Sequence, residues 1–304
     1  MRVAFIFPGQ GAQTPGMGKE IAKVFPAAAE VFAQANQILG IDMSTLCFEG
    51  PKSQLDQTEF AQPALLTTGI AIYQVLKQHG ITPVMMAGLS LGEYTALTAA
   101  GALTLEEALP LVRKRGQLMQ QAVAPGAGAM AAIMGASAEA IEAACLATDS
   151  NAQIANYNAP GQIVISGTAA AVAEAGAALK AAGARYLPLA VSVPSHSALM
   201  KPAAEQLKSE LQAIAWKSPE VPVVSNVNAI TNSAENFSGI LMQQLYCPVR
   251  WEESVHYLKK QVDHLIEIGP GTTLSAIVKR IDKEFILGSV EDAVGLEKIL
   301  QAIA

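Results

Sequence analysis

The sequence predicts an α/β protein with a mainly parallel sheet covered by helices on both faces, and with a smaller subdomain inserted into it. Three observations support this class. Short continuous apolar runs, such as VAFIF at 3–7, end at glycine or proline, which is typical of buried strands followed by loops. Segments with helical periodicity separate these runs. A central stretch, 127–191, carries strands and helices in a different order.

The first part of the chain alternates strands and helices. The run at 3–7 predicts a strand that ends at Pro8-Gly9, and VMMAG at 84–88 predicts a second strand. The segment EYTALTAAGA that follows it has a helical pattern, so Ser90 lies between a strand and a helix. Further helices are predicted near 18–38, 62–78 and 104–121.

The central stretch has the predicted order β-α-β-β-α-β, which is the ferredoxin-like pattern. Ser137 is a candidate cap for its first helix, and Gly183 stands where a left-handed C-cap would end the second. We therefore interpret 127–191 as an inserted ferredoxin-like subdomain and assign 1–126 and 192–304 to the body. Its strands are expected at 129–135, 153–157, 163–167 and 185–191, and its helices at 137–147 and 169–182.

The alternation of strands and helices resumes in the last third of the chain. Apolar runs there again end at turns, such as HLIEIG before Pro270-Gly271. Strands that alternate with helices imply a mainly parallel sheet, so this part completes the body. The strands are expected at 221–228, 264–269 and 284–290, and the helices near 198–215, 235–246 and 252–262 and at the C-terminus.

Composition limits the class of function. Of the 304 residues, 51% are apolar and 15% are charged, which permits a sizeable core. The net charge of −6 and the absence of a long basic run argue against nucleic-acid binding, which depends on Lys and Arg. No apolar segment is long enough for a membrane span or a signal peptide. Three scattered cysteines predict neither a disulfide framework nor a zinc site, so we expect a cytoplasmic protein.

The candidate nucleophile is Ser90, at the centre of the G-x-S-x-G motif in MAGLSLGEYTAL. The motif alone is expected by chance in about one chain in ten, and a serine that caps a helix is the alternative interpretation. Its place between an apolar run and a helix is the context that a nucleophile elbow requires. Such an elbow exposes the serine Oγ and directs N–H groups of the helix N-terminus toward a substrate carbonyl.

A serine nucleophile needs a base, and His196 is the best candidate among the four histidines. It lies in SVPSHSALM, at a loop between strand and helix where ligands collect in open parallel sheets. An exposed loop histidine is the alternative interpretation. No Asp or Glu stands in an obvious α/β-hydrolase position, so a main-chain carbonyl could orient the imidazole. The other histidines, His79, His256 and His264, lie in or beside predicted helices and a strand.

Two further stretches could contribute to such a site. FPGQGAQ at 7–13 follows a strand, and its glycines allow either a surface turn or a wall of an oxyanion site that uses the Gln10 N–H. The run Arg113, Lys114, Arg115 lies on a predicted helix, where successive residues point about 100° apart. One of the three could face a cleft and pair with a carboxylate, but the run does not indicate which one.

Together these stretches resemble one family over essentially the whole chain: the malonyl-CoA:acyl carrier protein transacylases, which include free-standing acyltransferases that serve polyketide synthases. The resemblance implies an α/β-hydrolase-like body with a ferredoxin-like insert. It also implies transfer of a malonyl group from malonyl-CoA to acyl carrier protein, in fatty acid or polyketide synthesis. We expect a monomer that needs no metal or other cofactor. The matching stretches are FPGQGAQ, GLSLGEYTAL, RGQLMQ, GAMAAIMG, NYNAPGQIVISG, VPSHSALM, QLYCPVRW and EIGPG.

The resemblance implies roles for the residues that meet at the reacting carbonyl. Ser90 would be the nucleophile that carries the acyl group. His196 would act first as the general base and then as the acid. The backbone N–H groups of Gln10 and Leu91 would form the oxyanion hole. With these roles, acyl transfer would proceed in two steps through an acyl-serine intermediate.

Three other positions have implied roles around that centre. Arg115 would bind the free carboxylate of the malonyl group, and Asn158 would line the acyl site. The main-chain carbonyl of Arg250 would orient His196. The chain departs from the family in two places: the family commonly has a histidine at Leu89, and often a glutamine at Arg250.

Two other functions could use some of the same residues. A hydrolase that removes acyl groups from carrier proteins would share Ser90 and His196 but would not need Arg115 to bind a carboxylate. A non-catalytic module that docks carrier proteins would need none of the three. For transfer or docking alike, the carrier-binding surface is expected to be locally basic because carrier proteins are acidic.

Overall fold

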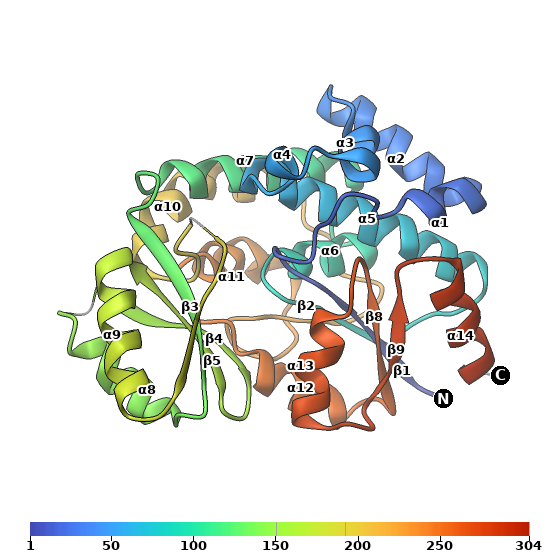
Figure 1. Ribbon diagram of the computed structural model, residues 1–304. Helices are drawn as coiled ribbons and strands as arrows, with labels where there is room; N and C mark the ends of the chain where they lie inside the picture. Colours follow the sequence, from blue (N-terminus) through green and yellow to red (C-terminus); the bar gives the residue numbers. More distant parts are fainter. Residues whose placement is uncertain (150, 192, 304) are drawn as a thin grey trace.

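The structure is a computed structural model that describes residues 1–149, 151–191 and 193–303 (Figure 1). Its larger sheet, sheet A, is parallel throughout, with the strand order β7-β2-β1-β8-β9. Because its strands run in one direction, the loops that follow them meet at one edge of the sheet. The strands are β1 (Val3–Phe7), β2 (Met85–Gly88), β7 (Val223–Val224), β8 (His264–Ile268) and β9 (Ile286–Val290).

Helices bury both faces of sheet A (Figure 1). Along β1, Phe5 and Phe7 join one core cluster and Ala4 and Ile6 join another, which explains its unbroken apolar run. Within the described residues, no helix has the length and apolar character needed to cross a membrane. The first cluster includes side chains from α1 (Lys19–Val24), α2 (Pro26–Leu39), α5 (Thr58–Gln78), α6 (Leu91–Ala99), α7 (Leu105–Gln121), α10 (Lys201–Ala213), α11 (Phe237–Gln244) and α14 (Ala293–Ile303), and the second from α12 (Trp251–Lys259) and α13 (Thr273–Ile281).

A second, antiparallel sheet, sheet B, has the strand order β4-β5-β3-β6. Two helices complete the order β-α-β-β-α-β, so this part has the predicted ferredoxin-like topology. The division of the chain at 126/127 and 191/192 stays a prediction, and residue 192 lies outside the described residues. The elements are β3 (Gly128–Met134), α8 (Ala138–Leu146), β4 (Ala152–Ala159), β5 (Gln162–Thr168), α9 (Ala169–Ala181) and β6 (Arg185–Pro188).

The helix ends in sheet B follow their local sequence signals. Ser137 Oγ accepts a hydrogen bond from the Ala140 N–H at 3.2 Å, so the predicted N-cap of α8 is confirmed. Gly183, just after α9, has a φ of 95°, which a glycine adopts without strain. Both helices pack against the sheet through a shared apolar cluster.

The structure differs from the sequence prediction in several boundaries. The helix predicted near 18–38 is two helices, because Phe25 is extended before Pro26 and a residue in that position avoids the α conformation. The strand predicted at 221–228 keeps only Val223–Val224 in the ladder, and β6 ends at Pro188. The sequence did not predict the short helices α3 (Met43–Glu49), α4 (Lys52–Leu55) and α13. The helices predicted near 198–215 and 235–246 begin with the 3-10 turns η1 (Ala198–Met200) and η2 (Ala234–Asn236).

Candidate active site

Ser90 lies on a tight turn between β2 and α6, with a φ of 55° and a ψ of −105°. Strain of this kind at a non-glycine residue is typical of a nucleophile elbow. The motif glycines make the turn possible: a Cβ on Gly88 would collide with the carbonyl group of Gly92, and a Cβ on Gly92 with the Phe7 carbonyl oxygen. The G-x-S-x-G pattern is therefore a packing requirement of this turn.

His196 is in hydrogen-bond contact with Ser90. Its Nε2 lies 2.9 Å from Ser90 Oγ, and its Nδ1 lies 2.7 Å from the Gln244 main-chain oxygen. Since a carbonyl oxygen only accepts, Nδ1 must carry the proton and donate it there. Nε2 is then the acceptor for the Ser90 hydroxyl. The structure thus brings the predicted nucleophile and the predicted base together, 106 residues apart in the chain.

The environment of His196 favours its neutral form. The side chain is 3% exposed. Burial, and then the nearby positive charge of Arg115, lower the pKa of His196 from its usual 6.5 to about 4. At neutral pH the imidazole is therefore unprotonated, and Nε2 can accept a proton from Ser90.

The prediction that the Arg250 carbonyl orients His196 is wrong. The carbonyl that accepts from His196 belongs to Gln244, the first residue of the stretch QLYCPVRW. Arg250 instead precedes α12, and its oxygen accepts from the Ser254 N–H and Oγ, as expected for the first carbonyl of a helix. Its guanidinium pairs with Glu253 on the surface. The matching stretch was the right signal, but the position within it was misassigned.

The two predicted oxyanion-hole residues lie beside Ser90 on the wall of one cavity. Leu91 is the first residue of α6, so its N–H has no acceptor within the helix. Gln10 follows β1, and its side chain donates to Thr58 Oγ1 at 3.1 Å, which holds the loop in place. Among the described residues, neither main-chain N–H donates to another main-chain group. Both can therefore serve a ligand oxygen in the cavity.

The structure decides which residue of the basic run faces the cavity. Arg113 is half-buried and pairs with Glu59 at 3.0 Å, and Lys114 is exposed. Arg115 is 1% exposed and lines the cavity with Ser90. The helix therefore turns a single guanidinium of the run toward the Ser90–His196 pair.

Arg115 is a buried cation that forms no direct ion pair with an acidic side chain of the described residues. Its Nη2 donates to Ser90 Oγ at 3.2 Å and to Gln244 Oε1 at 3.0 Å, and its guanidinium carbon lies 5.2 Å from the Tyr94 ring centroid. Within the described part of the chain it forms no salt bridge, and its Nε has no acceptor. Burial lowers the pKa of Arg115. Such a site is suited to a ligand carboxylate, which would form a direct ion pair with the guanidinium.

The cavity that holds these groups has a volume of about 890 Å³ and is lined by both parts of the molecule. Asn158 of β4 lines it, as predicted, and its Oδ1 has no partner among the described residues. Leu89, where the family commonly has histidine, also lines the cavity and packs against the core cluster that contains Ala4 and Ile6. The leucine therefore contributes an apolar part of the wall and does not replace the base.

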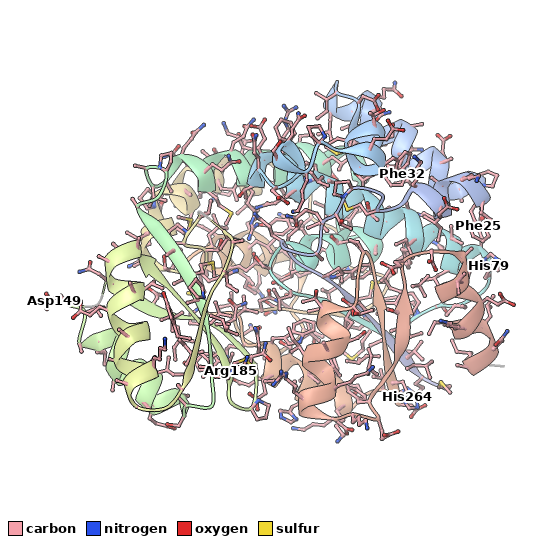
Figure 2. The ribbon with its side chains drawn as sticks, in the orientation of Figure 1. Phe25, Phe32, His79, Asp149, Arg185 and His264 are labelled. Carbon is pink, nitrogen blue, oxygen red and sulfur yellow. The ribbon has the colours of Figure 1, made fainter. Side chains whose placement is uncertain are left out.

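The other described histidines lie away from this cavity. His79 forms an edge-on contact with Phe25, with ring centroids 5.5 Å apart, and His264 Nδ1 lies 3.1 Å from the Glu284 carbonyl oxygen (Figure 2). His256 lies on α12 and is 3.9 Å from Glu252. His196 is therefore the histidine that the structure places at Ser90.

The chain is similar to known acyltransferases along nearly its whole length. The family described as "Acyl transferase domain" matches residues 4–299. A malonyl CoA-acyl carrier protein transacylase from Escherichia coli O157:H7 is 49% identical over 284 residues, which are 91% of this chain and 92% of that protein. The chain belongs to the malonyl CoA-acyl carrier protein transacylase family. The acyltransferase of the same name from Bacillus subtilis (strain 168) is 48% identical and covers 99% of this chain and 97% of its own.

Solved structures of transacylases share the fold of this acyltransferase. An acyl carrier protein S-malonyltransferase from Vibrio cholerae has a TM-score of 0.95 at 44% identity, and the match covers 98% of this chain and 100% of that one. A malonyl-transacylase solved in complex with its type II PKS acyl-carrier protein has a TM-score of 0.96 at 45% identity, covering 99% of both chains. The two sheets and their connections are therefore those of the family.

Three buried residues next to the Ser90–His196 pair of this acyltransferase were not predicted from the sequence. Gln244 contacts His196, Arg115 and Ser90, and Asn226 Oδ1 accepts from the Ser90 N–H at 2.6 Å. Glu93 accepts from both Gln244 and Asn226. Two of them stood in the matching stretches GLSLGEYTAL and QLYCPVRW, so the signal was present, but it did not show which side chains would meet.

The pH dependence of acylation tests the state of His196. Between pH 7 and pH 5 we expect kcat/KM for acylation to stay nearly constant, because the base is protonated only near its pKa of about 4. In Arg115→Ala, the fall of kcat/KM at low pH should begin at a higher pH, since the arginine charge lowers the pKa of His196. Rapid-quench measurements of acyl-enzyme formation give the profile. A tenfold fall per pH unit that starts near pH 6.5 would contradict the assignment.

Proposed function

We propose that this acyltransferase moves the malonyl group of malonyl-CoA to the phosphopantetheine thiol of acyl carrier protein through a malonyl-serine intermediate. The observation that carries the proposal is the position of Arg115. A buried guanidinium that forms no direct ion pair within the described residues lies 3.2 Å from the Oγ of a serine that is also bonded to a neutral histidine. A malonyl thioester carries its carboxylate one methylene group away from the reacting carbonyl, so it fits both groups at once.

The first half-reaction loads the enzyme. Ser90 Oγ attacks the thioester carbonyl carbon while His196 Nε2 accepts the hydroxyl proton. The N–H groups of Gln10 and Leu91 stabilise the oxyanion. The carbon–sulfur bond then breaks, and the coenzyme A sulfur takes the proton from His196. The malonyl carboxylate replaces Ser90 Oγ as the acceptor of the Arg115 Nη2 hydrogen bond.

The second half-reaction unloads it. The phosphopantetheine thiol gives its proton to His196 and its sulfur attacks the ester carbonyl carbon. The bond from carbon to Ser90 Oγ breaks, and Oγ recovers the proton from His196. Exchange of a thioester for an ester and back is close to neutral in free energy, so the proposal invokes no metal, ATP or other cofactor. Two successive transfers predict ping-pong kinetics.

The choice of acyl carrier protein as the acceptor rests on the relatives. The curated relatives carry it in their names, and one similar malonyl-transacylase was solved with an acyl-carrier protein bound. Carriers of fatty acid and of polyketide synthesis present the same thiol, and the proposal includes both. Cys47, Cys145 and Cys247 are free, which suits the reducing cytoplasm proposed for the enzyme.

The proposal is tested by following the malonyl group itself. The protein is mixed with malonyl-CoA, with and without phosphopantetheinylated acyl carrier protein, and intact masses and free malonate are measured. We expect malonyl-enzyme without carrier protein and malonyl-carrier protein with it. Rapid release of malonate in the absence of carrier protein would favour the hydrolase alternative, and no acylation at all would favour a docking module.

A further inference from the structure

Glu93 is a buried carboxylate that the proposed mechanism does not use. It lies in the first turn of α6 and is 2% exposed. Its Oε2 accepts hydrogen bonds from the Gln244 Nε2 at 2.7 Å and from the Asn226 main-chain N–H at 3.0 Å. A carboxylate removed from water is costly unless such bonds compensate it, so its presence beside the active site requires an explanation.

Gln244 connects Glu93 to the groups that react and bind. Its main-chain oxygen accepts from His196 Nδ1 at 2.7 Å, and its side-chain Oε1 accepts from Arg115 Nη2 at 3.0 Å. Its Nε2 donates to Glu93 and also to the Ser90 main-chain oxygen at 3.0 Å. One residue at the end of α11 therefore contacts the base, the carboxylate-binding arginine and the turn of the nucleophile.

The chemistry of Glu93 sets the orientation of the Gln244 amide. A carboxylate only accepts hydrogen bonds, so the amide must turn its NH₂ group toward Glu93. Its oxygen then faces Arg115, which only donates. If the amide were reversed, its NH₂ group would face the guanidinium, with donors on both sides and no acceptor between them. The orientation is therefore determined at both ends.

Asn226 forms a second arm of the same arrangement. Its main-chain N–H donates to Glu93, its Oδ1 accepts from the Ser90 N–H at 2.6 Å, and its Nδ2 donates to the Gly88 carbonyl at 2.7 Å. The loop after β7 is thus tied to both ends of the nucleophile turn. Glu93 joins this arm to Gln244, so α6, α11 and the β7 loop meet at one carboxylate.

We propose that Glu93 is a positioning residue that acts through Gln244 on both His196 and Arg115. Its contact with the Gln244 side chain holds the amide oxygen toward Arg115 and keeps the Gln244 carbonyl in line with His196 Nδ1. Malonyl selectivity and general-base catalysis are thereby coupled to one buried group that touches no substrate. This inference rests on the proposed malonyl transfer.

Glu93→Ala and Glu93→Gln separate positioning from simple stability. In Glu93→Ala we expect kcat/KM for malonyl transfer to fall about 100-fold and the preference for malonyl-CoA over acetyl-CoA to fall about tenfold, because a charge-assisted hydrogen bond is lost. Glu93→Gln can present its amide oxygen to the same two donors, so its values should recover to within about tenfold of wild type. Rates are expressed per folded molecule, counted by near-UV circular dichroism.

Ile299→Ala is the matched control for loss of stability. Ile299 is buried on α14, next to the edge strand β9, and has no contact with the cavity. Its truncation should destabilise the fold but leave the malonyl preference unchanged. If Glu93→Ala behaves like this control, with a lower melting temperature and an unchanged preference, Glu93 is merely structural. Equal defects in Glu93→Gln and Glu93→Ala would also overturn the positioning role.

Gln244→Leu provides a second route if Glu93→Ala does not fold. It removes the side-chain amide but keeps the main-chain oxygen that His196 uses. We expect the malonyl preference of Gln244→Leu to fall about tenfold. In the double variant with Glu93→Ala, the preference should be no lower than in the poorer single variant. If Glu93→Ala does not fold, Glu93→Gln takes its place in the double variant. Additive losses in the double variant would show that the two residues act independently.

The same measurements keep the two proposals distinguishable. Wild-type protein that is not acylated by malonyl-CoA would reject the proposed function, whatever Glu93 does. Normal wild-type transfer with an unchanged preference in Glu93→Ala would reject only the role of Glu93.

Discussion

Ser90→Ala is expected to leave no malonyl group on the protein after incubation with malonyl-CoA, and to lower transfer to acyl carrier protein by at least about 10³-fold. The substitution removes the oxygen that we propose forms the ester and leaves His196, Arg115 and the cavity in place. Malonyl-CoA should therefore still bind, with coenzyme A release abolished. Intact-mass spectrometry measures the adduct, and calorimetry or ligand competition measures binding.

Ser254→Ala is the control for this substitution. Ser254 is also buried, but its hydroxyl donates to the carbonyl oxygen of Arg250, just before α12, and the residue does not line the cavity. We expect a wild-type amount of adduct in this variant, and peptide mapping should locate that adduct at Ser90. A malonyl adduct that persists in Ser90→Ala would refute the nucleophile assignment.

Arg115→Ala is expected to lower malonyl transfer by about 10²- to 10³-fold while changing acetyl transfer much less. The guanidinium is buried, lacks an acidic partner in the described chain, and already donates toward Ser90 Oγ. A malonyl carboxylate gains a charge-assisted pair there, whereas an acetyl group leaves the cation unpaired. The selectivity ratio of kcat/KM values for malonyl-CoA and acetyl-CoA measures this difference.

Arg113→Ala is the matched control on the same helix. Arg113 pairs with Glu59 and does not line the cavity, so its loss should leave the selectivity ratio unchanged. Equal losses of malonyl and acetyl transfer in Arg115→Ala would show that Arg115 does not recognise the carboxylate.

Local sequence signals were sufficient for the elements that depend on neighbours in the chain. The apolar run of β1 reflects burial on both faces of the sheet, and the glycines around Ser90 reflect close backbone approach. Both features can be recognised in the amino-acid sequence. Pro26 also divides a predicted helix in two, and this too is a local effect of the sequence. The strand predicted at 221–228 ends before Asn226, whose main-chain N–H and side-chain groups instead form hydrogen bonds with Glu93, Ser90 and Gly88.

Local sequence patterns could not determine which of Arg113, Lys114 and Arg115 faces the cavity. Helical periodicity indicated only that the three point in different directions. The resemblance assigned Arg115, and its burial beside Ser90 agrees with that assignment. The same resemblance misplaced the carbonyl that orients His196, because a motif does not state which of its carbonyls is free of helix bonds.

The sequence by itself determined the fold class, the family, and the residues Ser90, His196 and Arg115 as candidates. These depend on apolar periodicity, backbone sterics and matching motifs, all of which are properties of short segments. Only the tertiary structure decided that Gln244 holds His196, and that Glu93 and Asn226 surround the nucleophile turn. Those contacts join residues 48 to 154 positions apart in the chain. Their hydrogen bonds form only after burial brings donors and acceptors from α6, α11 and the β7 loop within about 3 Å.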